Sequence, residues 1–169
     1  YVSATIETEA ELDEQYLTFL RAEIGAGLNL QGMKLVVDCA NGASFALAPR
    51  LFAELGAEVI AINASPNGRN INLDCGSLHP ETLQQRVRDT GADLGLAFDG
   101  DADRLLLVDE QGGIVDGDQV LFIVASYLHA QDKLACQRVV ATVMSNLGLE
   151  IALKEQGIEL VRTSVGEQA

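Results

Sequence analysis

The chain has 169 residues, with 11 Lys and Arg against 25 Asp and Glu and a formal net charge of −14. This acidity argues against sequence-independent binding to nucleic acid or to an anionic membrane surface, because both polyanions would repel it. The hydrophobic content of 48% argues against a solvated acidic tail and predicts a folded globule with a sizeable core.

Hydrophobic patterning predicts alternating helices and strands through the first part of the chain. In order these are a helix over 9–25, a strand over 33–39, a loop and helix over 40–56, and a strand over 57–63. A strand, helix and strand in succession are typical of a right-handed parallel crossover. A long irregular connection over 64–80 follows, and long loops inside compact domains are often functional. Pro80 then suits the first position of a helix that Gly91 ends.

The rest of the chain contains a hairpin and a second, smaller repeat of helices and strands. Strands are predicted over 92–98 and 104–109, followed by a turn over 110–113. Beyond the turn we expect a helix, a strand, a helix and a strand over 120–130, 138–143, 147–157 and 158–163. Two strands cannot form a complete sheet domain, so we place a domain boundary near Gly113 and expect the second domain to be incomplete.

Three carboxylates alternate with small residues in the sequence "FDGDADR". In an extended loop Asp99, Asp101 and Asp103 would point the same way and converge on a small volume. Unpaired, they would raise one another's pKa and oppose folding, and a hard divalent cation removes that conflict. Mg²⁺ suits such a site because it keeps open positions for water and phosphate oxygens. Arg104 follows directly and offers a planar fork for a phosphate.

The loop also permits other interpretations. A solvated acidic turn is disfavoured, because the loop follows a buried strand, where ligand sites of α/β folds lie. Asp99, Asp101, Asp103 and Glu110 also fit an EF-hand calcium loop, but Arg104 occupies the position that requires Gly. A phosphatase of haloacid dehalogenase type would use Asp99 as a nucleophile, but it wants a hydroxyl residue where Asp103 and Arg104 stand. A noncatalytic divalent-ion-binding module remains open.

The same motif resembles a known family. "FDGDADR" followed by "LLLVDEQGGIVDGD" is similar to the α-D-phosphohexomutase superfamily, whose metal loop has the pattern D-G-D-x-D-R, and "VVDCANGA" also fits. The stretch "NGRNINLDCGSLHPETL" resembles the phosphoglucosamine mutase branch. The resemblance implies an α/β fold, with one three-layer α/β/α mixed-sheet domain and part of a second similar domain. It covers essentially the whole chain as an internal fragment.

The resemblance also implies a reaction and the residues that serve it. The branch interconverts glucosamine 6-phosphate and glucosamine 1-phosphate, an isomerase reaction that runs through an enzyme phosphoserine and a bisphosphorylated sugar. Asp99, Asp101 and Asp103 would bind Mg²⁺ together with that phosphoserine, and Arg104 would bind phosphate. A sibling that acts on mannose or glucose phosphates is the nearest alternative. The substrate would be a hexosamine phosphate; no nucleic acid or membrane partner is implied, and the oligomeric state is left open.

The implied division of the chain leaves parts of the active centre outside it. Residues 1–30 would end a first domain and supply a connecting helix, 31–113 would form the second domain, and 114–169 an incomplete third. The family's serine loop and its other phosphate and sugar loops would lie upstream and downstream, so no catalytic residue is expected here. The chain has no initiator Met, and Glu167 to Ala169 depart from the branch pattern. We therefore expect a fragment that is inactive in isolation.

Several other polar residues have more ordinary interpretations. His79 is expected at a helix entry and His129 at a helix end. Asn41 and Gly42 follow a strand, and a plain turn is favoured there over an anion site. Ser145 and Asn146 end a strand and are expected near the substrate in the full enzyme. Either Asp116 or Asp118 is expected to cap a helix rather than to bind a second metal.

The cysteines and the first residues bear on the compartment. Cys39, Cys75 and Cys136 are odd in number and widely spaced, so neither a disulfide framework nor a zinc site is suggested. No segment reaches the roughly 20 apolar residues of a membrane span, and the acidic start is unlike a signal peptide. The sequence therefore predicts a reducing, cytoplasmic environment.

Overall fold

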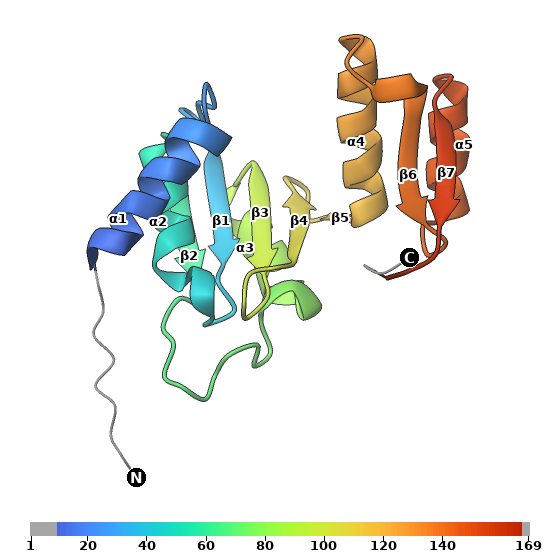
Figure 1. The fold of residues 1–169 in the computed structure, drawn as a ribbon. Coiled ribbons are helices and arrows are strands. Elements are labelled where there is room, and N and C mark those ends of the chain that lie inside the picture. Colours follow the sequence, from blue (N-terminus) through green and yellow to red (C-terminus); the bar gives the residue numbers. More distant parts are fainter. Residues whose placement is uncertain (1–9, 167–169) are drawn as a thin grey trace. The chain divides into compact units, whose positions relative to one another are not determined.

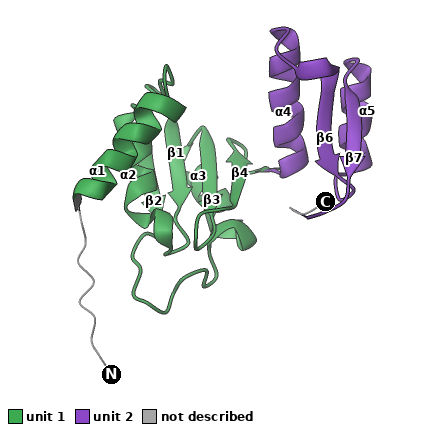
Figure 2. Ribbon diagram, in the orientation of Figure 1, with its two compact units in different colours: residues 1–114 green, residues 115–169 purple. Residues whose placement is uncertain are grey.

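The computed structural model describes residues 10–166, and these divide into two compact units on either side of the Ile114–Val115 bond (Figures 1 and 2). The first unit has two clusters of buried apolar side chains, and the second unit has one. None of the helices in the described part of the chain is long and apolar enough to span a membrane.

The first unit is built on a five-stranded mixed sheet in the order β2-β1-β3-β4-β5, whose last strand crosses the boundary between the units. Its strands are β1 Lys34–Asp38, β2 Glu58–Ile62, β3 Leu94–Phe98, β4 Leu105–Asp109 and β5 Ile114–Val115. β1 pairs in parallel with β2 and β3, whereas β3 pairs antiparallel with β4. The parallel strands therefore end at the same edge of the sheet, and β3, which is central, delivers its carboxyl end there.

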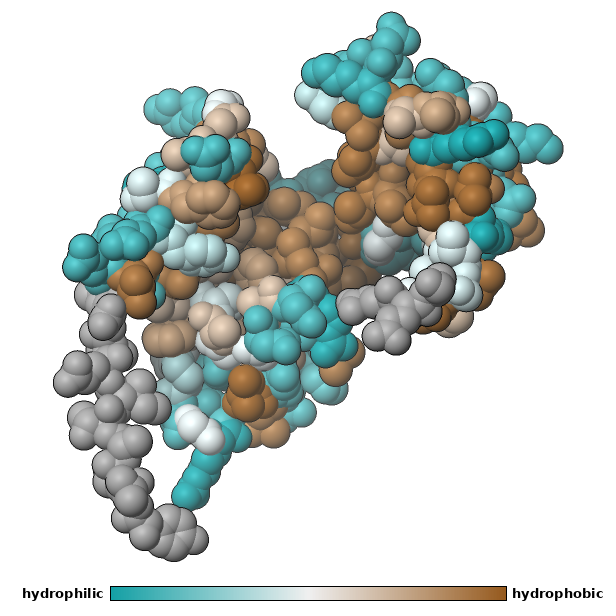
Figure 3. Space-filling model, in the orientation of Figure 1, coloured by the Kyte–Doolittle hydropathy of each residue, from teal (hydrophilic) through white to brown (hydrophobic). Residues whose placement is uncertain are grey.

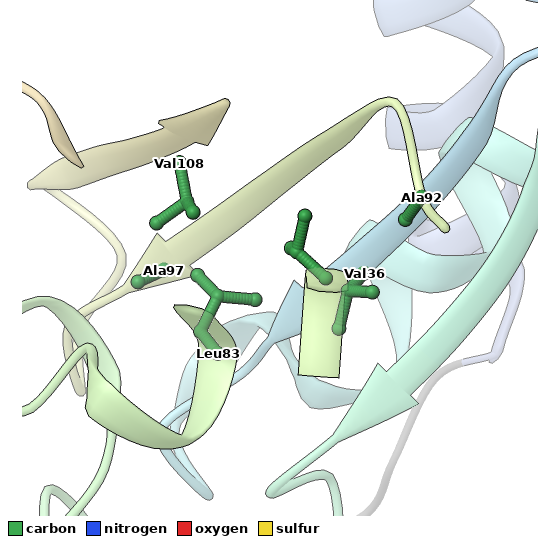
Figure 4. Close-up of a cluster of buried hydrophobic side chains, with 6 residues drawn as sticks. Val36, Leu83, Ala92, Ala97 and Val108 are labelled. Atoms are coloured by element: carbon green, nitrogen blue, oxygen red, sulfur yellow. The ribbon is translucent and has the colours of Figure 1, made fainter. Parts of the chain in front are cut away.

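Helices cover both faces of this sheet, as the alternation of side chains in β1 requires. Val36 points to one face, where it packs with side chains of α3 (Glu81–Thr90) and the neighbouring strands (Figure 4). Leu35 and Val37 point to the other face, which α2 (Leu47–Glu54) covers. The predicted three-layer α/β/α mixed-sheet domain is confirmed.

The first helix lies against α2. α1 (Ala10–Phe19) runs into a π-helical turn, Leu20–Ile24, that closes at Gly25; the predicted start at Glu9 lies outside the described residues. Leu17 is fully buried. Arg50 of α2 pairs with Glu14, and Arg21 pairs with Glu54 at 2.6 Å. Packing against this unit therefore buries Leu17, whereas Leu12, Tyr16 and Ile24 of the expected apolar face remain more than half exposed.

The connections include two short 3₁₀ turns at the carboxyl edge of the sheet, Ala43–Phe45 and Gly76–Leu78. The long connection between β2 and α3, green in Figure 1, runs past the ends of β1 and β3. Pro80 is the N-cap of α3 rather than its first residue, and its carbonyl accepts the N–H of Gln84 at 2.8 Å, the first hydrogen bond of the helix. Gly91 ends α3 in the left-handed conformation, as predicted.

The second unit contains a two-stranded parallel sheet and two helices that contact each other. Its elements are α4 Gly117–Ala130, a 3₁₀ turn Ala135–Gln137, β6 Arg138–Thr142, α5 Leu147–Glu155 and β7 Glu159–Thr163. α4 begins three residues before the predicted start, because Asp116 caps it and Gln119 completes a capping box. Val139 and Leu153 join its core, whereas Val140 of β6 is 62% exposed. Apolar surface, brown in Figure 3, is visible on both units.

Leu83 provides a test of the core of the first unit. It is fully buried between α3 and the sheet, so Leu83→Ala is expected to lower the free energy of unfolding by about 3 kcal/mol through lost burial and a cavity. Leu78→Ala is the matched control, because Leu78 is 68% exposed. Urea unfolding followed by circular dichroism measures both; equal midpoints for the two variants would contradict this packing.

Candidate metal centre

The acidic loop over 99–104 joins β3 to β4 at the carboxyl edge of the sheet. β3 brings its apolar side chains to both faces and then ends, so Asp99 is the first residue beyond the central strand. Asp99 is 3% exposed, whereas Asp101 and Asp103 are exposed. The loop thus has one buried carboxylate at its base and two at its surface.

The loop is a tight turn, so the premise of an extended loop was wrong. The N–H of Ala102 donates to the carbonyl of Asp99 at 3.2 Å, and Ala102 has a φ of +63°. The N–H of Asp99 donates to the carbonyl of Arg104 at 3.3 Å and closes the turn. A turn of this kind curls the chain back on itself. The carboxylates therefore meet because the backbone bends, not because alternate residues share a side.

The three carboxylates do converge. One oxygen from each of Asp99, Asp101 and Asp103 can be chosen so that all lie within 4.8 Å of one another. Asp101 and then Asp99 raise the pKa of Asp103, since a third negative charge is disfavoured beside two others. This mutual repulsion is what a bound cation would relieve.

Arg104 is closely tied to the buried carboxylate. Burial by itself raises the pKa of Asp99, but the N–H and the guanidinium of Arg104 outweigh it and hold that pKa below its usual range. The Arg104 N–H lies 3.0 Å from Oδ1 of Asp99, and its Nε lies 2.8 Å from Oδ2. Its side chain is nonetheless 65% exposed. In this structure Arg104 orients Asp99; phosphate binding by Arg104 stays a prediction.

The donor set fits a hard divalent cation. Three carboxylates offer oxygen ligands only, which suits Mg²⁺, Mn²⁺ or Ca²⁺ and disfavours metals that prefer nitrogen or sulfur. Three ligands from one short turn also leave part of a coordination sphere open for other oxygens. Asp99, Asp101 and Asp103 are therefore the residues that would hold a metal here.

Two neighbouring segments pack closely against this loop. A Cβ at Gly42 would lie 2.2 Å from the carbonyl oxygen of Gly100, and a Cβ at Gly100 would lie 2.7 Å from Nδ2 of Asn72. The N–H of Ala43 donates to the Gly100 carbonyl at 2.8 Å. The turn at Asn41 and Gly42 thus supports the acidic loop through a backbone contact. The pattern of neighbouring residues in the sequence does not reveal this role.

Sequence reasoning also missed Asp38, the last residue of β1. Its side chain is fully buried and accepts hydrogen bonds from the N–H of Ala40 at 2.9 Å, the amide of Asn63 at 3.0 Å and the N–H of Gly76 at 3.0 Å. An acidic residue at the end of a β-branched run was the available signal, since buried charges are rare unless they are paired. The carboxylate joins three connections at the edge where the acidic loop lies.

The remaining candidates of the sequence belong to the second unit. Asn146 caps α5 by accepting the N–H of Leu149 at 2.9 Å, and its own N–H donates to Asp118 at 2.7 Å. The carbonyl of Ser145 accepts from Arg162 at 2.8 Å. Asp116 is the predicted cap of α4. Asn146 therefore has a structural role, and contact of Ser145 and Asn146 with a substrate stays a prediction.

The cysteines give a direct test of burial. All three are unpaired; Cys39 and Cys75 are buried and Cys136 is exposed. Burial raises the pKa of Cys39 to about 11 and also raises that of Cys75, which keeps both as unreactive thiols. A disulfide reagent at neutral pH is expected to label Cys136 alone in the native chain and all three cysteines in denaturant. Rapid native labelling of Cys39 would contradict the packing of β1.

Comparisons with known proteins agree with this architecture. The sequence matches the family profiles described as phosphoglucomutase/phosphomannomutase, alpha/beta/alpha domain II, over residues 14–113, and domain III over residues 116–169. A solved structure of a phosphoglucomutase/phosphomannomutase family protein from Burkholderia thailandensis superposes with a TM-score of 0.75 at 30% identity, covering 92% of this chain and 33% of that one.

Several curated relatives are named phosphoglucosamine mutase. The protein of this name from Thermoanaerobacter sp. (strain X514) is 59% identical to this chain over 153 residues, which cover 90% of this chain and 34% of that protein. In Acetivibrio thermocellus the identity is 53% over 167 residues, covering 99% of this chain and 36% of that protein. The chain thus spans about a third of the length of these relatives.

Proposed function

The chain belongs to the phosphoglucomutase/phosphomannomutase family, and from this premise we propose that it is part of a phosphoglucosamine mutase that interconverts glucosamine 6-phosphate and glucosamine 1-phosphate. The similarity to relatives named phosphoglucosamine mutase supports the choice of sugar. The convergence of three carboxylates at the end of β3 is the observation that carries the chemistry. A hexosamine phosphate is the proposed substrate.

Within that reaction, Asp99, Asp101 and Asp103 are proposed to hold Mg²⁺, which would stabilise negative charge on a phosphoryl group during its transfer. Asp99 is fixed by its two hydrogen bonds to Arg104, so one ligand is already oriented. The exposed Asp101 and Asp103 can adjust to the ion. Binding energy is therefore not spent on moving the buried ligand.

Arg104 is proposed to contact the phosphate that occupies the same centre. Its exposed guanidinium presents further N–H groups beyond the Nε that meets Asp99, and a planar fork matches phosphate oxygens. Arg104 would then join the buried ligand to the phosphate. The phosphoserine of the reaction is proposed to come from a part of the protein outside this chain, which is why the chain alone is expected to be inactive.

The domain assignment follows the same proposal. We assign 1–30 to the end of a first domain and a connecting helix, 31–113 to the second domain, and 114–169 to an incomplete third. Ser145 and Asn146 are proposed as neighbours of the substrate in the complete protein. Its proposed location is the cytoplasm, which the three unpaired cysteines favour.

A hybrid protein tests the proposed activity. The matching 153 residues of the Thermoanaerobacter relative, which are 59% identical to this chain, would be replaced by the corresponding residues of this chain. The hybrid is expected to form glucosamine 1-phosphate from glucosamine 6-phosphate in the presence of Mg²⁺, and the same hybrid with Asp101→Asn is expected to lose about 100-fold or more in rate.

Two outcomes count against the proposal. A hybrid that folds, as judged by circular dichroism, but forms no glucosamine 1-phosphate would contradict the activity. A hybrid that prefers mannose 6-phosphate or glucose 6-phosphate would show that the substrate is that of a sibling mutase and not the amino sugar. The unmodified relative, assayed in parallel, sets the reference rate for each sugar.

A further inference from the structure

Asp38 lies at the point where three connections of the first unit meet, although it is not one of the clustered carboxylates. Both of its oxygens are used: Oδ1 accepts the N–H of Ala40, and Oδ2 accepts the amide of Asn63 and the N–H of Gly76. The partners lie 2, 25 and 38 residues away along the chain. One fully buried side chain thus determines where the ends of β1 and β2 and the 3₁₀ turn before α3 lie.

Two of these segments contact the acidic loop or β3, the strand that precedes it. Gly76 lies against the end of β3, because a Cβ there would be 2.5 Å from the carbonyl oxygen of Phe98. The turn that begins at Ala40 carries the backbone contact with Gly100. In addition, the N–H of Asn72 donates to the Ala40 carbonyl at 2.9 Å. The 40–43 turn and Asn72, which both contact Gly100, are therefore linked to each other and to Asp38.

The backbone near Asp38 adopts conformations that need such support. Ala40, Asn41 and Asn63 have φ values of +50°, +48° and +48°, in the left-handed region that residues other than glycine adopt uncommonly, Asn more often than Ala. Conformations of this kind persist when surrounding contacts over-determine them. Two of the three residues donate directly to Asp38, and the third, Asn41, donates its N–H to the Asn63 carbonyl at 2.6 Å.

We propose that Asp38 is a positioning residue for the metal centre: its carboxylate holds the 40–43 turn and the 70–76 segment against Gly100 and so fixes the acidic loop in its ion-binding shape. This inference rests on the proposed function, because it takes Asp99, Asp101 and Asp103 as the ligands. Asp38 acts through the backbone of its neighbours and does not itself touch the ion. Loss of one oxygen acceptor should therefore loosen the loop and weaken ion binding.

Mn²⁺ binding to the 169-residue chain, measured by electron paramagnetic resonance, tests the proposal with Asp38→Asn. The amide of Asn would direct a donor at groups that are themselves donors, and we expect a loss of about tenfold in Mn²⁺ affinity, as for other residues that orient metal ligands. Asp109→Asn is the matched control. Asp109 also accepts backbone N–H groups, from Gln111 and Gly113, but at the opposite edge of the sheet. The Mn²⁺ affinity of Asp109→Asn should therefore equal that of the unsubstituted chain.

Hydrogen exchange of the metal-free chain separates positioning from general instability. The amide hydrogen of Ala43, which bonds Gly100, should exchange faster in Asp38→Asn while the amide hydrogens of β1 exchange as before. Equal acceleration of both would overturn the proposal, because it would mean that the whole unit had lost stability. If Asp38→Asn does not fold, Asn63→Gly tests the proposal in its place. This variant removes one hydrogen-bond donor to Asp38, and glycine readily adopts the positive φ at that position. An unchanged Mn²⁺ affinity of Asn63→Gly would overturn the proposal.

Failure of this inference differs from failure of the proposed function. If the unsubstituted chain binds Mn²⁺ and Asp38→Asn binds it equally well, the positioning role is overturned and the metal centre stands. If the unsubstituted chain binds no Mn²⁺ at all, the metal centre and the positioning role are overturned together.

Discussion

Asp101→Asn is expected to lower the affinity of the chain for Mn²⁺ by about 100-fold, because ligand charge sets the affinity of an all-oxygen site. Asp101 supplies one of the three clustered carboxylates and is exposed, so its replacement removes a negative ligand without disturbing the core. Asn keeps the size of the side chain and offers a neutral oxygen in its place. Titration calorimetry with Mn²⁺ measures the change.

Asp89→Asn is the control for Asp101→Asn. It removes the same charge from the exposed surface of α3, where Asp89 accepts a hydrogen bond from Gln85 at 2.6 Å. Its Mn²⁺ affinity should equal that of the unsubstituted chain, since a distant exposed charge is largely screened. If both variants lost the same small amount of affinity, binding would reflect the net charge of −14 and not a specific site.

Gly42→Ala is expected to lower the free energy of unfolding by about 2–3 kcal/mol and to weaken Mn²⁺ binding as well. The added methyl group would lie 2.2 Å from the Gly100 carbonyl oxygen and within 2.7 Å of its Cα and carbonyl carbon. Backbone atoms cannot rotate away as a side chain can, so the 40–43 turn and the acidic loop must separate. Chemical unfolding and a Mn²⁺ titration on the same variant measure the two effects.

Gly117→Ala is the matched control for Gly42→Ala. Gly117 is the first residue of α4, and among the described residues no heavy atom beyond its chain neighbours and the nearby helix backbone lies within 4 Å of the methyl group that alanine would add. Its stability is expected to stay within about 0.5 kcal/mol of the unsubstituted chain or to rise slightly, as alanine favours a helix over glycine. Gly42→Ala with the same stability as Gly117→Ala would show that the close approach of the two turns is wrong.

Local patterns were sufficient to predict the strands and the clustered carboxylates. The apolar run before Asp99 marks a buried strand, and the short spacing of Asp99, Asp101 and Asp103 confines them to one loop at its end. The capping residue Asp116 and the terminating Gly91 were also predictable, because each acts within a few residues of its own position.

Features that depend on contacts between distant segments were not predictable in this way. The bend at Ala102 requires a positive φ at a residue that rarely adopts it, so an extended loop was the natural expectation. Asp38 reaches Gly76 across 38 positions, and the contact of Gly42 with Gly100 spans an even longer stretch of the chain. A single sequence shows that Asp38 is acidic and that Gly42 and Gly100 are small, but it does not show which distant residues they contact.

The acidic loop is proposed to hold one divalent ion between its three carboxylates. Anomalous diffraction from a crystal of the chain soaked in Mn²⁺ locates such an ion directly. We expect a single strong peak within bonding distance of oxygens of Asp99, Asp101 and Asp103, which already approach to within 4.8 Å of one another. A Mn²⁺ peak elsewhere on the chain with none at this loop would contradict it.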